Sequence, residues 1–220
     1  MITISDKISS KKYQLTKELM SECLKNNKSK PKKWFIKGKK INVNNRMQKN
    51  YTYELTFNAG TNLKNGGLDA DGNKIVYKDF NPKYSPGVML NMGVFEGKYC
   101  NDQIFEFPKE WYLNINKFSP EKSNYKINYF KIKSRQSLQE WRRKKWIPCA
   151  DGDMDKRGWF EWYCRYWIGR RQPNVDIIQI KRWRSFTRHS AQVKKHSAGK
   201  LDQRTRQRQA LLQWSYDAKI

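Results

Sequence analysis

The chain has 220 residues, with 46 lysines and arginines against 20 aspartates and glutamates, so its formal net charge is +26 and its pI is near 10.0. Aromatic residues make up 14% of the sequence, which excludes a disordered basic tail because such tails are poor in Trp, Tyr and Phe. This excess of positive charge indicates an anionic partner, either nucleic acid or another acidic surface.

The cysteines and the apolar segments indicate the cellular compartment in which the protein is found. Four cysteines lie far apart without a CxxC pair, which favours reduced thiols over a disulfide scaffold: Cys23, Cys100, Cys149 and Cys164. The first residues, MITISDKISSKK, lack the apolar core of a secretory signal, and no apolar run has the length of a membrane span. We therefore expect a soluble intracellular protein without a membrane partner, in the nucleus, or in a virion if the source is viral.

Residues 1–33 have the pattern of a short helix followed by a basic linker. Residues 10–25 place Leu15, Leu19 and Cys23 on one face of an amphipathic helix. The segment NNKSKPKK then has the composition of a connector. It is either a solvated linker or a flexible basic arm that adds phosphate contacts.

Residues 34–133 are expected to form a Lys-rich, mainly β portion. KWFIKGKKINV and YTYELTF alternate aromatic or branched residues with polar ones, and Ile75–Tyr77 repeats the pattern. NAGTNLKNGG and DADGN between them have turn compositions, and the apolar run VMLNMGVFEGKY follows. A short helix is expected to start at Pro108 and include Trp111, because proline is favoured in the first turn.

The composition changes near residue 134, where arginine replaces lysine as the main basic residue. A guanidinium group is a planar fork suited to phosphate and to aromatic rings, whereas an ammonium group is a compact point charge. We therefore expect residues 134–220 to carry the surface that engages the partner, and the Lys-rich part to supply general attraction.

The first two helices of this module have clear boundary signals. Ser137 and Glu140 form a capping box that opens a helix ending before Pro148. The second helix lies within Asp155–Arg171, DKRGWFEWYCRYWIGRR, with Asp155 as N-cap and Gly169 as stop signal. It is aromatic nearly all round, apart from an i,i+4 pair of Glu161 and Arg165, which predicts a central core helix. The alternative is that some of its rings are exposed and stack on bases.

Two more helices are expected after residue 174. The third runs from about Val175 to Lys195 and has an apolar and a basic face. Its apolar face is formed by Val175, Ile178, Trp183, Phe186 and Val193, and its basic stripe by Lys181, Arg184, Arg188 and Lys195. Gly199 marks the turn to the fourth helix, RTRQRQALLQWSY, which Asp202 is expected to cap. Short connections between these helices imply a compact helical module.

These elements predict an α+β protein, with an N-terminal mainly β portion and a C-terminal Arg-rich helical module around the aromatic central helix. The expected function is non-enzymatic binding of DNA or RNA through phosphates, without a cofactor or a metal ion. Gln207, Gln209 and Gln213 could add contacts to bases or sugars. The expected phosphate-binding residues are Arg170, Arg171, Lys181, Arg184, Arg188, Arg204 and Arg208. The alternative is that the basic stripe of the third helix is an ordinary solvated helix face without a partner.

A metal-dependent nuclease is a second hypothesis. Asp79, followed by Glu96 and Lys98 in FEGKY, is similar to the D…ExK pattern of restriction-endonuclease-like nucleases. There, two carboxylates hold Mg²⁺ and a lysine stabilises charge near the scissile phosphate; Asp102 could assist. The alternative is a Glu/Lys pair at a strand edge, since this pattern arises easily in a Lys-rich chain.

Other constellations are weaker. Asp151–Asp155 begins like a calcium loop, but Lys156 and Trp162 stand where that loop requires Gly and Glu. The spacing of the histidines and cysteines does not predict a zinc site, and His189 is expected to be a hydrogen-bonded core residue. A third hypothesis is a structural component of a virion or large nucleoprotein assembly, which would use the same basic surface against packaged nucleic acid or an acidic protein.

The block RGWFEWYCRYWIGRR…QIKRW…RH…RQRQALLQW, within the C-terminal third of the chain, resembles a Trp-rich basic protein family of algae, fungi and large DNA viruses. The family itself is uncharacterised, so the resemblance implies no activity, cofactor or site residue. The frequent use of Lys and Asn would suit an AT-rich genome, including that of a large virus.

Overall fold

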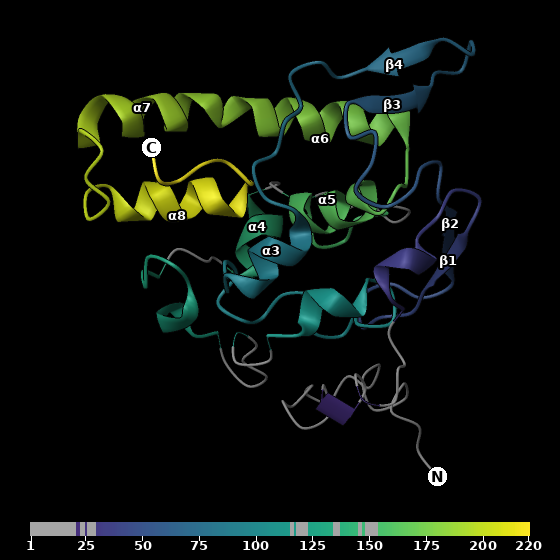
Figure 1. Ribbon diagram of the computed structural model, residues 1–220, viewed down its shortest axis with the longest axis horizontal. Helices are drawn as coiled ribbons and strands as arrows, with labels where there is room; N and C mark the ends of the chain where they lie inside the picture. The colour runs from purple at the N-terminus through teal and green to yellow at the C-terminus, as the bar shows by residue number, and fades with distance from the viewer. Residues whose placement is uncertain are drawn as a thin grey trace.

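The computed structural model describes residues 21, 22, 25, 30–114, 117, 123–133, 137–144, 147 and 154–220. Helices account for 38% of the described residues and small antiparallel sheets for 9%, with the strands first and the longer helices last, which confirms the α+β class (Figure 1). The helix expected over residues 10–25 falls mostly outside the described residues; Ser21, Glu22 and Lys25 are helical.

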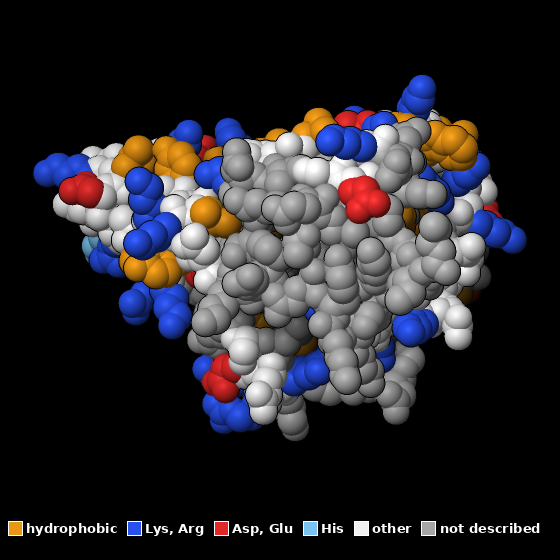
Figure 2. All heavy atoms as spheres, turned by 90° about the horizontal axis from the view of Figure 1, so that it is seen from below, with side chains coloured by type: hydrophobic (Ala, Val, Ile, Leu, Met, Phe, Trp, Pro, Cys, Tyr) orange, Lys and Arg blue, Asp and Glu red, His pale blue; other side chains and the backbone are white. Residues whose placement is uncertain are grey.

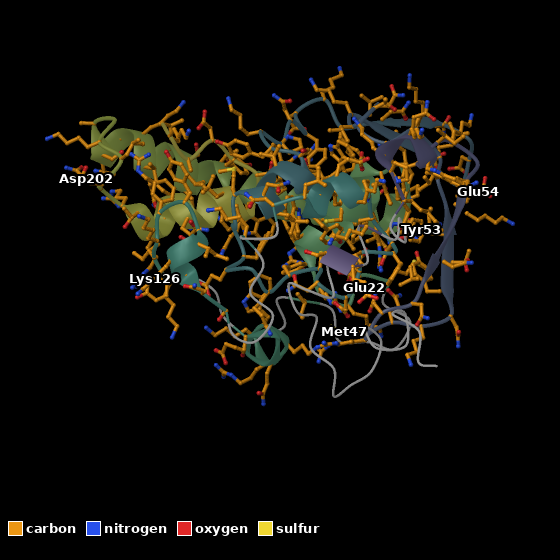
Figure 3. The ribbon with its side chains drawn as sticks, turned by 60° about the horizontal axis from the view of Figure 1, so that its bottom comes forward. Glu22, Met47, Tyr53, Glu54, Lys126 and Asp202 are labelled. Atoms are coloured by element: carbon orange, nitrogen blue, oxygen red, sulfur yellow. The ribbon has the colours of Figure 1, made fainter. Side chains whose placement is uncertain are left out.

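The first sheet is an antiparallel pair of strands that follows a short 3-10 helix, η1 (Lys32–Trp34). Strand β1 (Lys40–Val43) pairs with β2 (Tyr51–Glu54), and Ile41 lies opposite Tyr53. Alternate side chains are buried, so one face of the pair contacts the core. Figure 3 shows this alternation on β2, where Tyr53 lies toward the interior and Glu54 at the outer edge. The strands expected over KWFIKGKKINV and YTYELTF are confirmed for KINV and YTYE only, because Trp34 belongs to η1.

The second sheet is a hairpin of β3 (Asn65–Leu68) and β4 (Lys74–Val76). Its turn is held by Asp69, whose Oδ1 accepts the N–H groups of Asp71 at 3.0 Å and Asn73 at 2.8 Å. Strand β4 was expected, whereas β3 lies in a segment expected to be a loop. Gly66 is required there for packing, because a Cβ on it would lie 2.8 Å from the Ile75 side chain.

Residues 77–133 contain helices and irregular segments, and the described strands end at Val76. Helix α3 (Pro86–Asn91) starts at Ser85, whose hydroxyl accepts the N–H of Val88, and Pro86 supplies its first turn. The 3-10 helices are η2 (Lys109–Tyr112), which confirms the short helix after Pro108, and η4 (Tyr125–Ile127). A mainly β character therefore applies to residues 40–76 rather than to all of 34–133.

The Ser137 half of the expected capping box is confirmed, whereas the Glu140 carboxylate binds Arg143 and Lys144 instead of completing the box. In α4 (Leu138–Arg143), the hydroxyl of Ser137 accepts the N–H of Glu140 at 3.1 Å. The charge and hydrogen bonds of neighbouring cations, led by Arg143, lower the pKa of Glu140 to about 2.

Helix α5 (Trp159–Trp167) is the centre of the hydrophobic core, and its side chains from Trp159 to Tyr166 are all buried. The Phe80 ring packs against four aromatic rings, with centroid separations of 5.1 to 6.4 Å: those of Trp162, Tyr163, Tyr166 and Trp183. The buried cluster includes residues from Phe35 to Ala218, so it is continuous across residue 134. The core-helix prediction is confirmed, and stacking of bases on these buried rings was a wrong alternative.

Several buried polar groups on α5 have specific partners, although the buried indole N–H of Trp159 has none among the described residues. The indole N–H of Trp162 donates to Asp176 at 2.8 Å, and the hydroxyl of Tyr166 donates to the carbonyl of Leu63 at 2.8 Å. The helix begins after Gly158, and Asp155 does not cap it, contrary to expectation. Asp155 is instead buried as an ion-pair partner of arginines.

The last three helices form the upper layer in Figure 1. Helices α6 (Pro173–Ser185) and α7 (Thr187–Ser197) follow one line, and α8 (Thr205–Gln213) folds back beneath α7. The single helix expected over 175–195 is therefore divided at Phe186. The α7–α8 turn contains Gly199, as predicted, but no side chain caps α8, so Asp202 does not have its expected role. Across the described residues, every helix falls short of the length and hydropathy that a bilayer span requires.

Candidate nucleic-acid interface

The interior contains charged groups of both signs. The buried acids are Glu96, Asp102, Glu106, Asp155, Glu161 and Asp176, and the buried bases are Arg157, Arg165, Arg170, Arg171 and Arg208. Because these charges nearly cancel, the positive excess of the chain belongs to the remaining residues. In Figure 2, Lys and Arg side chains are spread around the rim of the described surface, with few Asp and Glu side chains between them.

Arg165 lies at the centre of the buried charges. Its guanidinium group contacts three carboxylates, at 2.6 Å for Glu106, 3.0 Å for Asp155 and 3.6 Å for Glu161. Burial raises the pKa of Glu161, although Arg165 and Arg157 act against this rise. The predicted i,i+4 pair of Glu161 and Arg165 is confirmed, but both side chains belong to the interior. Arg165 therefore holds α5 to other segments of the fold.

Arg170 and Arg171 are not on the surface, which corrects the expectation that they bind phosphate. Arg170 is 1% exposed and pairs with Asp155 at 2.6 Å. Arg171 lies over the Tyr166 ring, 3.7 Å from its centroid, and donates to main-chain carbonyls, including that of Asn65 at 2.7 Å. Both side chains are buried, so a phosphate could reach them only after local rearrangement.

Arg208 is a third corrected residue, with 0% exposure. Its guanidinium group binds the α7–α8 turn and the last residues of the chain together. The acceptors are the carbonyls of Lys200, Gln203, Ala218 and Ile220 and the hydroxyl of Ser197, at 2.6 to 3.0 Å. All described buried cations are arginines. Part of the arginine enrichment after residue 134 therefore has a structural cause, because one guanidinium group can donate to several buried acceptors.

The basic stripe of the third expected helix is confirmed as an exposed surface. Lys181, Arg184, Arg188 and Lys195 are all exposed. At 3.6 residues per turn they lie within one face of α6 and α7, over about 20 Å at 1.5 Å per residue. Arg184 pairs with Asp79 at 2.6 Å, and the other three have no ion pair with a described carboxylate. The stripe thus presents a row of solvated cations.

The opposite face of this helix pair differs partly from expectation. Trp183 and Val193 are buried as predicted, whereas Ile178 is 58% exposed and its neighbour Ile177 is 56% exposed. Asp176 occupies the buried position in that turn. Burial raises the pKa of Asp176 to about 6, although Trp162 and Gln172 donate hydrogen bonds to its carboxylate.

The start of α8 adds cations beside the turn. Arg204 and Arg206 are exposed, and Arg204 donates to the side chain of Gln207 at 2.9 Å. Asp202 lies at the same end of the molecule and offsets part of this charge (Figure 3). Gln209 is fully buried and donates to the carbonyl of Val94, so its expected contact with bases is wrong.

The residues of the nuclease hypothesis have different environments. Asp79 is exposed and paired with Arg184, whereas Glu96 is 3% exposed in the loop after α3. Among the described residues, no three His, Cys, Asp or Glu side chains are placed to hold a metal ion. The arrangement therefore lends the nuclease hypothesis no support. His189 is exposed and stacks on Phe186, so its expected place in the core is wrong.

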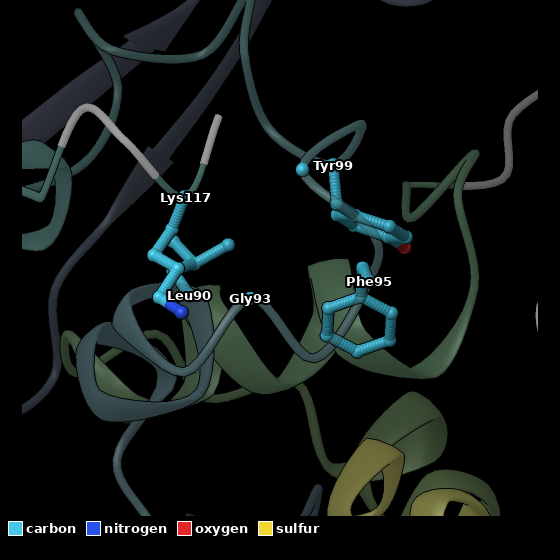
Figure 4. A pocket seen from close by; sticks show the side chains of 6 residues that line it. Leu90, Gly93, Phe95, Tyr99 and Lys117 are labelled. Atoms are coloured by element: carbon cyan, nitrogen blue, oxygen red, sulfur yellow. The ribbon is translucent and has the colours of Figure 1, made fainter. Parts of the chain in front are cut away.

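A small hollow lies beside α3 and is lined by Leu90, Gly93, Phe95, Gly97, Tyr99 and Lys117 (Figure 4). Both of its polar side-chain groups already have partners. The hydroxyl of Tyr99 donates to the carbonyl of Arg157 at 2.6 Å, and the Lys117 ammonium donates to the carbonyl of Ile127 at 3.2 Å. The hollow therefore offers little with which to orient a polar ligand.

A second exposed cationic surface lies around Trp34, for which the alternating sequence pattern predicts a strand. Trp34 belongs to η1 and is 48% exposed, and the ammonium of Lys39 lies 4.8 Å from its ring centroid. The signal that could have identified this surface is the density of lysine between residues 30 and 40.

No protein-family model matches this chain, and the searches of curated proteins and of solved structures likewise found no significant match. The resemblance to the Trp-rich family stays a prediction.

Proposed function

We propose that the protein binds nucleic acid without catalysing a reaction, mainly through phosphate contacts of Lys181, Arg184, Arg188 and Lys195. The exposed stripe on α6 and α7 is the observation that carries this proposal. A row of cations about 20 Å long spans about six phosphates along one strand of a duplex, at 3.4 Å per phosphate. The near cancellation of the buried charges leaves the rest of the surface positive and supports long-range attraction to a polyanion.

The experiment is a titration of labelled DNA and RNA, single- and double-stranded, followed by fluorescence anisotropy in EDTA over a range of salt. The affinity should fall steeply, with a log–log slope of about −0.9 per phosphate contact. Reversing Lys181, Arg184 and Arg188 to Glu should reduce affinity by on the order of 10- to 100-fold and flatten the slope by about 3.

The matched control reverses the same charge elsewhere. Lys126, Lys131 and Lys133 are exposed on and after η4. Figure 3 shows Lys126 apart from α6 and α7. Reversal of these three lysines to Glu changes the net charge equally but should leave most of the salt slope intact. If both triple variants lose affinity equally, the stripe is not the contact surface. If the unaltered protein binds no nucleic acid, the proposed function is wrong.

Two other observations, cleavage in Mg²⁺ and behaviour during purification, separate the other hypotheses. Fragments that appear with Mg²⁺ and disappear in Glu96→Gln would establish the nuclease instead. A component of a virion or nucleoprotein assembly would use the same stripe, and it should be poorly soluble or aggregated when purified without its assembly.

A further inference from the structure

Trp34 differs from the other tryptophans of the chain in its exposure. The chain has nine tryptophans, and of those that are described, only Trp34 is exposed, at 48%. A tryptophan usually buries most of its surface, because its ring is the largest apolar group among the side chains. The exposure of this indole on a strongly cationic segment therefore indicates a role in binding.

The backbone holds this ring outward. Phe35, the next residue, is 1% exposed, and its carbonyl accepts the N–H of Ala59 at 2.8 Å. The N–H of Trp34 closes the 3-10 turn by donating to Pro31 at 2.9 Å. With Phe35 anchored in the core, its neighbours Trp34 and Ile36 remain outside, and Ile36 is 52% exposed. The indole is thus presented by a fixed turn, which reduces the ordering cost of a stacking contact.

Lysine is frequent in the segment that carries this ring, and Lys39 contacts the ring itself. Residues 30–40 contain Lys30, Lys32, Lys33, Lys37, Lys39 and Lys40 and no acidic residue. Burial lowers the pKa of Lys30, and the charge of Lys39 adds to this effect. Two acids lie nearby: Glu54 is opposite Lys40 on β2, and Glu110 accepts the main-chain N–H of Lys32 at 3.0 Å. They offset only part of this charge.

An ordinary exposed cation–π pair would explain the contact of Lys39 with Trp34, but not the free remainder of the ring or the surrounding lysines. A duplex presents phosphates but hides the faces of its bases, so it would leave the indole unused. An unpaired strand offers both phosphates and base faces, the two groups that a cationic groove with an aromatic platform recognises.

We propose that Trp34 is a stacking platform for an unpaired base of single-stranded nucleic acid, with Lys33, Lys37 and Lys39 contacting the adjacent phosphates. This inference rests on the proposed function and adds the form of nucleic acid that it prefers. Loss of one base–aromatic stack typically weakens binding by about 5- to 100-fold.

The experiment compares Trp34→Leu, which keeps an apolar side chain without a ring, with Trp34→Phe, which keeps a ring. Binding is measured with a single-stranded oligonucleotide and with an abasic strand of the same length. Trp34→Leu should bind the normal strand about 5- to 100-fold more weakly, whereas Trp34→Phe should lose much less. For the abasic strand, both variants should have the same affinity as the unaltered protein. Thermal unfolding of each variant confirms that the fold is retained.

A second measurement uses a single strand that contains 5-bromouracil, which is crosslinked to the unaltered protein by irradiation of the complex. The protein is then digested with a protease that cleaves after Glu. The adduct should fall in the peptide of residues 23–54 and on Trp34. Equal binding by Trp34→Leu, equal losses on both strands, or an adduct elsewhere would each overturn the platform. If the platform is overturned but a duplex still binds through the α6–α7 stripe, the proposed function is retained. If neither form binds, both proposals fail together.

Discussion

The Nε of Arg165 lies 2.6 Å from Oε1 of Glu106, and neither side chain is more than 3% exposed. This ion pair joins α5 to a loop segment 59 residues earlier in the chain. The hydroxyl of Tyr53 also donates to Glu106 at 3.1 Å, so β2 belongs to the same network. Such charges are costly to remove from water and are tolerated because each has several partners.

Removing Arg165 should therefore be far more harmful than removing an exposed arginine. Arg165→Met leaves Glu106, Asp155 and Glu161 without their shared cation and should lower the free energy of unfolding by about 3–5 kcal/mol. Arg184→Met is the matched control, because it removes an ion pair of the same length, 2.6 Å, at the surface. That change should cost less than about 1 kcal/mol. Urea unfolding of both variants measures the difference, and equal losses would contradict the structural role of Arg165.

Gly169 should tolerate no side chain. Its φ is +117°, and a methyl group there would overlap the carbonyl oxygen of Phe57. Gly169→Ala should therefore destabilise the protein by more than about 3 kcal/mol, since backbone strain and a clash with main chain combine. Gly38→Ala is the control: its φ is also positive, at +80°, but the space around it is open. It should cost about 1–2 kcal/mol. Thermal unfolding that ranks the two variants in reverse would refute the close approach at Phe57.

Asp176 should give the protein a distinctive pH dependence. Its pKa of about 6 in the folded state lies above the value near 3.9 of an unfolded aspartate. The folded protein binds the proton more tightly, so this group favours folding more as pH falls from about 7 to 4. Other carboxylates act in the opposite direction, and a comparison with Asp176→Asn isolates the effect.

The unfolding free energy of the natural protein should gain about 1–3 kcal/mol relative to Asp176→Asn over that pH range. Denaturant titrations at several pH values measure this difference. A difference that is constant with pH would mean that Asp176 keeps an ordinary pKa.

Arg208 should control the order of the C-terminal segment. Lysine at this position cannot reach the acceptors on both the α7–α8 turn and the last residues, so Arg208→Lys should cost at least about 2 kcal/mol. Hydrogen exchange of residues 214–220 should accelerate. Arg204→Lys, four residues earlier on the exposed end of α8, should change stability by less than about 0.5 kcal/mol. Unchanged exchange in Arg208→Lys would show that the segment is held by its other contacts.

The elements that could be predicted are those whose local pattern agrees with their environment. Helix α5 is apolar nearly all round, and only the interior suits such a surface. The N-cap at Ser137 is a local hydrogen bond, and the stripe of Lys181, Arg184 and Arg188 follows from helical spacing alone. These features depend little on distant parts of the chain.

The wrong predictions involve residues whose role is decided by distant partners. Arg170 and Arg208 carry the same charge as Arg184, but only their acceptors, which come from other segments, explain why they are buried. Strand β3 contains Gly66 and Gly67, which usually indicate a turn, and it forms because β4 and α6 pack against it. Trp34 fits an alternating strand pattern, and only the anchoring of Phe35 reveals which way its ring faces.

As far as the chain is described, the buried cations of this protein are all arginines, whereas its lysines are exposed or only partly buried. Acetylation, which acts on ammonium groups, would strip positive charge from the outside and leave every buried guanidinium–carboxylate contact as it is. Substitutions of lysine likewise could accumulate without disturbing the core. The attraction of this molecule for polyanions can therefore be adjusted, by modification or by mutation, separately from the energy that keeps it folded.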